Sequence, residues 1–315
     1  MKKKMQMTSF LLAVFAVIAI AGCNKAKSGD GAAGGDYKVG YIVGSREHVF
    51  YTLIEKGIKD SAGANGINAV VMDGNLDGKV TSDHIENFVA DKMRAIALSA
   101  NDPGGTTPAI REAVENNIPV FTFDCTIDDA SLITSFVGTD NVEGGRLGGR
   151  ETVRLAESGA KVGLINFDNP QSCLDRRKGW EEVVKSSDKN LQIIEVGNYE
   201  GDASKAEQLM TDALTQNPDL AVVFCVGDPA AAGALAAIKT AGAKTKIIGF
   251  DGNPEAKAAL LDPTNGEYWV SEISQNPQEI GKLVTEQIKK YLDTGAVDQK
   301  VIMVAPYIIT KENAR

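Results

Sequence analysis

KIIGFDG, residues 246–252, is an apolar run that ends in an aspartate followed by a glycine, and PVFTFD, residues 119–124, also ends in an aspartate. Both runs are short and rich in β-branched and aromatic residues, which is typical of strands. Strands that are apolar at nearly every position are buried on both faces, as in a parallel sheet that is covered by helices. These two stretches therefore predict a parallel α/β fold.

The same alternation extends over most of the chain. Helical patterns separate the apolar runs, so right-handed crossovers are predicted between parallel strands, with enough strands for two sheets of similar size. The predicted strands are residues 38–43, 68–72, 95–98, 119–123, 161–166, 192–196, 221–225 and 246–250. The predicted helices are residues 51–64, 82–92, 108–116, 142–158, 177–186, 204–215 and 230–241.

Polar and aromatic residues follow several of these strands. A doubly wound sheet binds its ligand at the carboxyl ends of its strands. Asp124 and Asp251 follow two strands, Gly227 and Asp228 follow a third, and GSREHVFY (residues 44–51) follows the first. These ends predict a crevice with more than one carboxylate and a pair of aromatic rings.

The start of the chain predicts export. Lys2, Lys3 and Lys4 precede an apolar run at residues 10–20 that is too short to span a bilayer comfortably, and Ile20-Ala21-Gly22-Cys23 follows. This pattern is typical of a bacterial lipoprotein signal (residues 1–22), with lipid attached to Cys23 and a flexible tether over residues 23–36. An ordinary secretory signal, or a lone membrane helix with an incidental cysteine, is the alternative.

Composition excludes several classes of function. The chain has 33 basic and 42 acidic side chains, a formal net charge of −9, which argues against a nucleic-acid partner. Cys125, Cys173 and Cys225 are widely spaced, so they indicate neither a metal site nor a disulfide framework; free thiols are expected, with one bridge as the alternative. The two histidines and the absence of a catalytic triad or phosphate loop argue against an enzyme, and neither a cofactor nor a metal is predicted.

A set of motifs, in order along residues 37–315, resembles the periplasmic sugar-binding proteins of the ribose-binding type, which are the solute receptors of ABC importers. The residues that carry the resemblance are Phe50-Tyr51-Thr52-Leu53 with Gly57, residues 118–124, Gly138-Thr139-Asp140-Asn141 with Gly144-Gly145, Gly179-Trp180, Asn217-Pro218-Asp219, Gly233-Ala234-Leu235, Gly249-Phe250-Asp251-Gly252, Gln275 with Pro277, and Ile280-Gly281. Each motif is weak alone, and their order and spacing are specific.

The resemblance implies two doubly wound parallel-sheet lobes joined by three hinge crossings, the periplasmic-binding-protein type I fold. The crossings are expected near residues 139–141, 275–276 and 305–306. The amino-terminal lobe would then combine residues 37–139 with 276–304, and the carboxy-terminal lobe residues 140–275 with 305–315. Ligand would lie between the lobes and favour their closure.

The resemblance also implies a set of ligand contacts. Asp124 and Asp251, one from each lobe, would accept hydrogen bonds from sugar hydroxyls, and Gln275 can both donate and accept. Phe50 and Tyr51 would stack on the sugar, although either can instead be a core aromatic. The other expected ligand-binding residues are His48, Cys125 and Gly227. For Asp228, capping of the helix that follows is the alternative.

The chain departs from the family pattern where ribose and galactose binders often carry arginine. Cys125 stands at one such position and Leu174 at another, and Gly227 replaces a common asparagine. Arg176 falls at a position that normally supports the structure. The pocket is therefore expected to hold fewer donors than a ribose site, unless Arg46, Asn169 or Gln171 compensates, and the solute need not be ribose.

These observations predict a lipid-anchored solute-binding protein of a sugar ABC importer, in the periplasm or on the outer face of the cell membrane. Its expected partners are a small sugar or polyol and the permease subunits of the importer. One alternative is a sensory receptor that presents its ligand to a chemoreceptor or sensor kinase. Another is a binder of a furanosyl signalling molecule.

Overall fold

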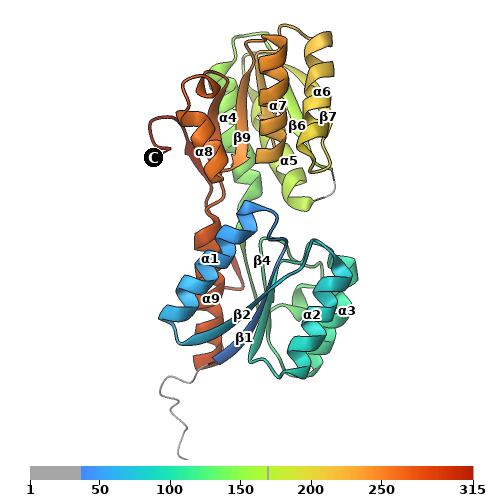
Figure 1. Cartoon of the computed structure of the whole chain (residues 1–315), viewed down its shortest axis with the longest axis vertical. Helices are drawn as coiled ribbons and strands as arrows, with labels where there is room; N and C mark the ends of the chain where they lie inside the picture. The colour runs from blue at the N-terminus through green and yellow to red at the C-terminus, as the bar shows by residue number, and fades with distance from the viewer. Residues whose placement is uncertain (1–36, 169, 315) are drawn as a thin grey trace, which may run out of the picture. The chain divides into compact units, whose positions relative to one another are not determined.

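The computed structural model describes residues 37–168 and 170–314. The predicted signal, Cys23 and the tether lie outside the described residues. Two six-stranded sheets organise the described chain, with strand orders β11-β5-β4-β3-β1-β2 and β12-β10-β9-β8-β6-β7. Each sheet and the helices that pack on it are called a lobe below (Figure 1). Both lobes are α/β, as the sequence predicts.

The first lobe is built on a fully parallel sheet. Its strands are β1 (Tyr37–Val43), β2 (Ile67–Asp73), β3 (Ala95–Leu98), β4 (Val120–Phe123), β5 (Ser135–Thr139) and β11 (Val301–Val304). Its helices are α1 (Val49–Ala64), α2 (Gly78–Ala90), α3 (Pro103–Glu115) and α9 (Pro277–Thr294), with a short 3-10 turn at Ala130–Leu132.

Alternate residues of the first sheet face two different cores. Tyr41 belongs to the cluster formed with α1 and α9, whereas Ile42 belongs to the cluster formed with α2 and α3. Successive side chains of a strand point to opposite faces, so helices cover both faces of this sheet. Helices α1 and α9 lie side by side although residues 65–276, which include most of the second lobe, separate them in sequence (Figure 1).

The second lobe has a parallel sheet with one antiparallel edge strand. Its strands are β6 (Lys161–Asn166), β7 (Gln192–Asn198), β8 (Val222–Cys225), β9 (Lys246–Asp251), β10 (Trp269–Ser274) and the antiparallel β12 (Tyr307–Ile309). Its helices are α4 (Asn141–Leu155), α5 (Gln171–Ser186), α6 (Ala203–Gln216), α7 (Asp228–Ala241) and α8 (Pro254–Leu261), with a 3-10 turn at Asn265–Glu267.

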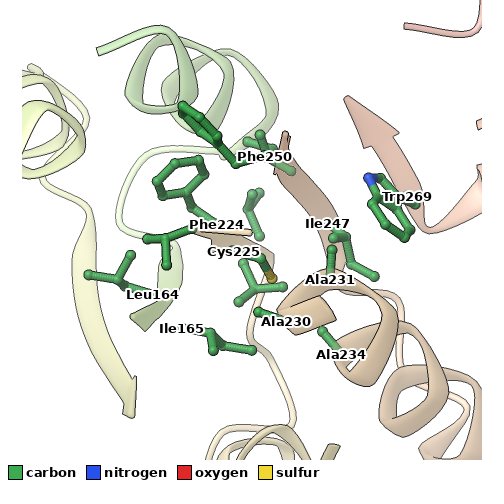
Figure 2. Close-up of a cluster of buried hydrophobic side chains, with 14 of the residues drawn as sticks. Leu164, Ile165, Phe224, Cys225, Ala230, Ala231, Ala234, Ile247, Phe250 and Trp269 are labelled. Carbon is green, nitrogen blue, oxygen red and sulfur yellow. The ribbon is translucent and has the colours of Figure 1, made fainter. Parts of the chain in front are cut away.

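The core of the second lobe has aromatic side chains next to the central strands and small side chains between α7 and the sheet. Phe224 and Phe250 pack edge to face, with ring centroids 6.4 Å apart. Ala230, Ala231 and Ala234 bring α7 close to the sheet (Figure 2). The mixture of large and small side chains fills the space between sheet and helix, as dense interior packing requires.

The chain passes between the two sheets three times. It leaves β5 and enters α4 at Asp140, leaves β10 and enters α9 at Gln275 and Asn276, and leaves β11 and enters β12 at residues 305–306. Two of these crossings are joined, because Thr139 Oγ1 donates a hydrogen bond of 3.0 Å to Gln275 Oε1. Asn276 has φ +58°, a left-handed conformation that asparagine tolerates better than most residues.

The strands β5, β10, β11 and β12 and the helices α8 and α9 were not among the predicted elements. Strand β10 shows the reason, because the buried carboxyl of Glu272 interrupts its apolar pattern. Strands β11 and β12 have four and three residues and lie at sheet edges, and only the last residue of each is fully buried. Short runs of this kind carry little periodic signal.

Glycines allow each lobe to bring two helices into close contact. A Cβ on Gly179 of α5 would lie 2.0 Å from Val142 O of α4, and a Cβ on Gly57 of α1 would lie 2.1 Å from Gln278 O of α9. Backbone stands where the methyl group would be, so neither contact can be relieved by a side-chain rotation. These glycines therefore set the spacing of both helix pairs.

We expect Gly179→Ala to destabilise the second lobe by about 1–3 kcal/mol, because the added methyl forces α4 and α5 apart. Urea unfolding measures the change. Gly63→Ala is the matched control: nothing lies within 4 Å of its Cβ, and alanine favours a helix over glycine, so this variant should be slightly stabilised. Equal stabilities for Gly179→Ala and the unaltered chain would contradict the tight contact.

Candidate functional site

Five side chains of the first lobe meet near the carboxyl ends of β1, β3 and β4. Asp124 Oδ2 accepts hydrogen bonds from the Tyr51 hydroxyl at 2.9 Å, from Ser99 Oγ at 3.1 Å and from Cys125 Sγ at 3.4 Å. Asn101 Nδ2 donates to the Tyr51 hydroxyl at 2.7 Å. We call Tyr51, Ser99, Asn101, Asp124 and Cys125 the first-lobe cluster.

The backbone turns sharply where β4 ends, which places Asp124 in the cluster. Asp124 has φ +60°, a left-handed conformation that is uncommon for residues other than glycine and is tolerated by aspartate. Its amide donates to Val137 O at 2.9 Å, and the amide of Cys125 donates to Phe123 O at 2.7 Å. The strand end is therefore tied on both sides, and the carboxylate is held in a fixed position.

Burial dominates the acidities of the first-lobe cluster. It raises the pKa of Asp124, while hydrogen bonds from Tyr51 and Cys125 and the charge of Arg176 act in the opposite direction. Burial likewise raises the pKa of Tyr51 and of Cys125 well above their ordinary values, with a further contribution from the charge of Asp124. Tyrosine and cysteine therefore stay protonated and act as donors toward the carboxylate.

In the second lobe, Asp251 is the centre of another hydrogen-bonded group. Its Oδ1 accepts from Arg176 Nη1 at 3.2 Å and from Gln275 Nε2 at 2.5 Å, and its Oδ2 accepts from the backbone amide of Asp228 at 3.3 Å. Asp251 ends β9 with φ +119°, a strained conformation for a residue with a side chain. Strain of this kind is maintained where surrounding contacts fix the residue.

Arg176 lies within the candidate site itself and does not act only as a distant support. Its Nε donates to Asn141 Oδ1 at 2.9 Å, its Nη1 donates to Val226 O at 2.6 Å, and its guanidinium lies 3.9 Å above the centre of the Phe250 ring. No described acceptor bonds to Nη2, the remaining donor nitrogen. Arg176 therefore orients Asp251 and keeps one NH₂ group for another partner.

The charges at the strand ends of the two lobes influence one another. The charge of Arg176 lowers the pKa of Asp124 in the first lobe, and the charge of Asp124 raises the pKa of Asp251 in the second lobe. Burial is the largest cause of the raised pKa at both aspartates. Two carboxylates and one guanidinium thus form one electrostatic group.

A second carboxyl pair lies behind Asp251. Glu272 is fully buried on β10, and its oxygens accept from the backbone amide of Gly252 and from Trp269 Nε1, each at 3.0 Å. Asp228 Oδ2 accepts from the amide of Asn253 at 3.0 Å, while its buried Oδ1 has no hydrogen-bond partner among the described residues. The charges of Asp228 and Glu272 nevertheless influence one another.

Both carboxyls of this pair have raised pKa values. Burial raises the pKa of Glu272 well above the ordinary range, and the negative charges of Asp228 and Asp251 raise it further. Burial and the charge of Asp251 raise the pKa of Asp228, whereas the hydrogen bond from the amide of Asn253 lowers it. The side chain of Asp228 therefore fastens the loop after β9 by its bond to Asn253 and does not cap its own helix.

We expect Asp228→Asn to flatten the dependence of stability on pH. Because both carboxyl pKa values are raised, the folded chain holds protons that the unfolded chain releases above pH about 4, so their contribution to stability falls as the pH rises. Asparagine keeps an acceptor for Asn253 and supplies a donor for Glu272. The variant should match the unaltered chain at pH 5 and exceed it by roughly 1 kcal/mol at pH 8.

Urea unfolding at pH 5, 6.5 and 8 measures this effect. Asp83→Asn, at an exposed carboxylate of α2 paired with Lys79, is the control and should give a curve parallel to that of the unaltered chain. A stability of Asp228→Asn that declines with pH as steeply as that of the unaltered chain would show that the buried pair is not the cause.

The remaining predicted ligand contacts lie at the same strand ends with different exposure. His48 is exposed immediately before α1, and Phe50 and Tyr51 are buried with their rings 5.2 Å apart, edge to face. Gly227 is buried, and a Cβ there would lie 2.9 Å from the Tyr199 hydroxyl and 3.5 Å from Asp251 Oδ2. The small residue at 227 thus leaves room for Tyr199 beside Asp251.

Two of the residues suggested as substitutes for the absent arginines are engaged elsewhere. Arg46 donates to both carboxylate oxygens of Glu55, at 2.8 and 3.1 Å, and to Val71 O at 2.9 Å. Gln171 Nε2 donates to Asp175 at 2.9 Å. The third, Asn169, lies outside the described residues. Arg176 is the guanidinium that the structure brings to the site.

Sequence reasoning missed four residues of the site: Ser99, Asn101, Tyr199 and Glu272. Ser99 directly follows β3, Asn101 lies two residues further on, and Tyr199 directly follows β7, so the strand-end rule applied to every strand finds three of the four. Glu272 lies inside a strand that was itself missed. Cys125, Cys173 and Cys225 are free thiols, and burial raises the pKa of Cys173 to about 11.

Three surface cavities lie away from these clusters. Their volumes are about 400, 320 and 690 Å³, and none is lined by a predicted ligand-binding residue. Over residues 37–168 and 170–314, no three His, Cys, Asp or Glu side chains are placed to hold a metal ion. Within the same ranges no helix has the length and apolar character needed to cross a bilayer.

Comparison with known proteins identifies the class to which this fold and these strand-end clusters belong. Residues 39–296 match the model of the family described as periplasmic binding protein domain. The chain therefore belongs to this family, whose members are periplasmic sugar-binding proteins, transport components rather than enzymes. The predicted resemblance to the ribose-binding type is confirmed.

The relatives with similar sequences include proteins that are named for the import of a sugar. The ribose import binding protein of Bacillus subtilis is 27% identical over 252 residues, which cover 80% of each chain. The fructose import binding protein of Bifidobacterium longum is 27% identical over 314 residues, covering 96% of this chain and 93% of its own. The family and these relatives indicate an extracytoplasmic location.

Solved structures share the two-lobed fold. A periplasmic ribose ABC transporter protein from Conexibacter woesei superimposes with a TM-score of 0.82 at 23% identity, covering 90% of this chain and 95% of that one. A solute-binding protein from Mycobacterium smegmatis with bound glycerol gives a TM-score of 0.78 at 26% identity, covering 89% and 96%. The predicted type I periplasmic-binding-protein fold is thus confirmed.

Proposed function

We propose that this chain is the solute-binding component of a sugar ABC importer and that it captures a small polyhydroxylated molecule between its two lobes. The observation that carries the proposal is the pair of fixed carboxylates, Asp124 in one lobe and Asp251 in the other, coupled through the charge of Arg176. Carboxylates at strand ends are suited to accept hydrogen bonds from neighbouring hydroxyls.

The two lobes would move as separate bodies about the crossings. We assign residues 37–139 and 276–304 to one lobe and 140–275 and 305–315 to the other, in keeping with the membership of the strands in the two sheets. A ligand that bonds to both lobes stabilises the closed arrangement through contacts that the open arrangement lacks. Thr139 and Gln275, which are joined at the crossings, would adjust as the lobes close.

The proposed contacts follow from the geometry. Asp124 and Asp251 would accept hydrogen bonds from polar groups of the ligand, Arg176 would donate through Nη2, and Phe50 and Tyr51 would border the apolar face of the ligand. His48, Cys125, Gly227 and Gln275 would line the same space, Gln275 also holding Asp251 in place. We further propose that lipid on Cys23 anchors the protein at the membrane, beside the permease subunits that receive its ligand.

Isothermal titration calorimetry of the purified chain against pentoses, hexoses and polyols tests the proposal. We expect at least one of these compounds to bind with micromolar affinity or better, and Asp124→Asn and Asp251→Asn each to weaken that binding. Asp219→Asn is the control, because this exposed carboxylate pairs with Lys161 on the surface. Absence of binding to every small hydrophilic compound would refute the function.

A further inference from the structure

The first-lobe cluster has no hydrogen left to donate. The Tyr51 hydroxyl, Ser99 Oγ and Cys125 Sγ all donate to Asp124 Oδ2. Because Tyr51 gives its only proton to Asp124, its oxygen must accept from Asn101, whose amide group also lies 3.7 Å from Cys125 Sγ. The backbone amides of Ala100, Asn101, Asp124 and Cys125 donate to main-chain carbonyls.

Two acceptors remain open in the first-lobe cluster. No described donor bonds to Asp124 Oδ1 or to Asn101 Oδ1, and neither oxygen is among the fully buried atoms that lack a partner. A ligand group that meets this surface therefore finds a carboxylate oxygen and an amide oxygen, and no N–H or O–H directed outward. This surface accepts hydrogen bonds only.

A sugar hydroxyl is a poor match to such a surface. A hydroxyl donates one hydrogen bond and also has lone pairs that require a donor, and a buried polar atom without a partner costs about 1–3 kcal/mol. An ammonium group donates three hydrogen bonds and accepts none. It satisfies Asp124 Oδ1 and Asn101 Oδ1 together and leaves no lone pair without a partner.

The charge balance favours the same occupant. Asp124 has no cation of its own lobe in hydrogen-bond contact, since Arg46 is bound to Glu55. The nearby guanidinium, Arg176, makes its contact at 3.2 Å with Asp251. Two aspartates thus share one arginine. A positive charge beside Asp124 would compensate the second carboxylate, and the Phe50 and Tyr51 rings next to it can also favour a cation.

We propose that the first-lobe cluster recognises a protonated amino group, so that the preferred ligand is an amino sugar or amino polyol rather than a neutral sugar. This inference rests on the proposed function and specifies the chemical class of its ligand. The cation is an amine and not a metal ion, because no metal-holding group of three or more side chains occurs among the described residues.

Matched ligands test the inference. Calorimetry would compare glucosamine, galactosamine and 1-amino-1-deoxysorbitol with glucose, galactose and sorbitol, in which a hydroxyl replaces the amine. N-acetylglucosamine and N-acetylgalactosamine keep the nitrogen and remove its charge. We expect at least one amine to bind ten-fold or more tightly than its hydroxyl counterpart, and its acetylated form, where there is one, to bind no better than the neutral sugar.

Variants separate the charge of Asp124 from other effects. Asp124→Asn should bring the ratio between amine and hydroxyl affinities close to one, and Cys125→Arg, which adds a guanidinium beside Asp124, should reverse the preference. Asp219→Asn should leave the ratio unchanged. If every neutral member binds as tightly as its amine or more tightly, the inference is wrong and the proposed function stands. If no compound of either kind binds, both fail.

Discussion

Replacing Asp251 by alanine is expected to abolish most ligand binding and to destabilise the second lobe. The affinity should fall by about 30-fold or more, because loss of a charged acceptor from a buried site costs around 2 kcal/mol or more. Stability should fall by about 3–5 kcal/mol, because Arg176 is 5% exposed and would lose the carboxylate that compensates its charge. Calorimetry and urea unfolding measure the two effects.

Asp251→Asn separates binding from folding. The amide keeps the shape of the side chain and one acceptor for Gln275 or Arg176, so most of the protein should remain folded while the charge-assisted contact with ligand is lost. An affinity of Asp251→Asn within two-fold of the unaltered chain would show that the carboxylate does not contact ligand. The proposed site would then be wrong even if the lobe remained folded.

Trp180→Ala is expected to have the largest effect on folding alone. Trp180 is fully buried on α5 and stacks on Phe224 with ring centroids 6.1 Å apart and an interplanar angle of 8°. Its Nε1 donates to Thr152 Oγ1 at 2.9 Å, which links α5 to α4. Removing a buried indole leaves a cavity, and substitutions of this kind cost about 3–5 kcal/mol.

Trp180→Phe should recover much of this loss, because a phenyl ring can still pack on Phe224 while the bond to Thr152 is lost. Thermal unfolding compares the two variants. Protein that remains folded should bind ligand with unchanged affinity, since the Trp180 side chain bonds to Thr152 and not to Asp251 or Arg176. A selective loss of affinity in a stable Trp180→Phe variant would instead place this tryptophan in the binding site.

The sequence predicted those parts of the fold that repeat a simple pattern. Strands β3 and β6 have the predicted bounds because nearly every residue in them is buried. Strand β10 was missed because Glu272 and two serines lie among its apolar residues. The burial of Glu272 and Ser271 is compensated by partners outside the strand, Gly252 and Glu151. A single sequence does not show such long-range compensation.

The sequence predicted those residues of the candidate site that lie at the ends of strands. Asp124 and Asp251 follow β4 and end β9, so their position could be read from the order of the elements. Arg176 could not be placed in this way, because it comes from the interior of α5 and reaches Asp251 only through the packing of α5 on α4. Asn101 lies close to a strand end, so its position could have been predicted from the order of the elements. Its role could not, because Asn101 acts through the hydrogen bond that it donates to the Tyr51 hydroxyl.

The strand order has a consequence for the order in which the two lobes can fold during export. The first lobe receives its edge strand β11 and its helix α9 from residues 277–304, whereas residues 141–274 supply five of the six strands of the second lobe without interruption. A chain delivered from its amino terminus would therefore finish most of its later half before its earlier half. Until α9 arrives, Ile54 and Ile58 of α1 would stay exposed to chaperones and proteases.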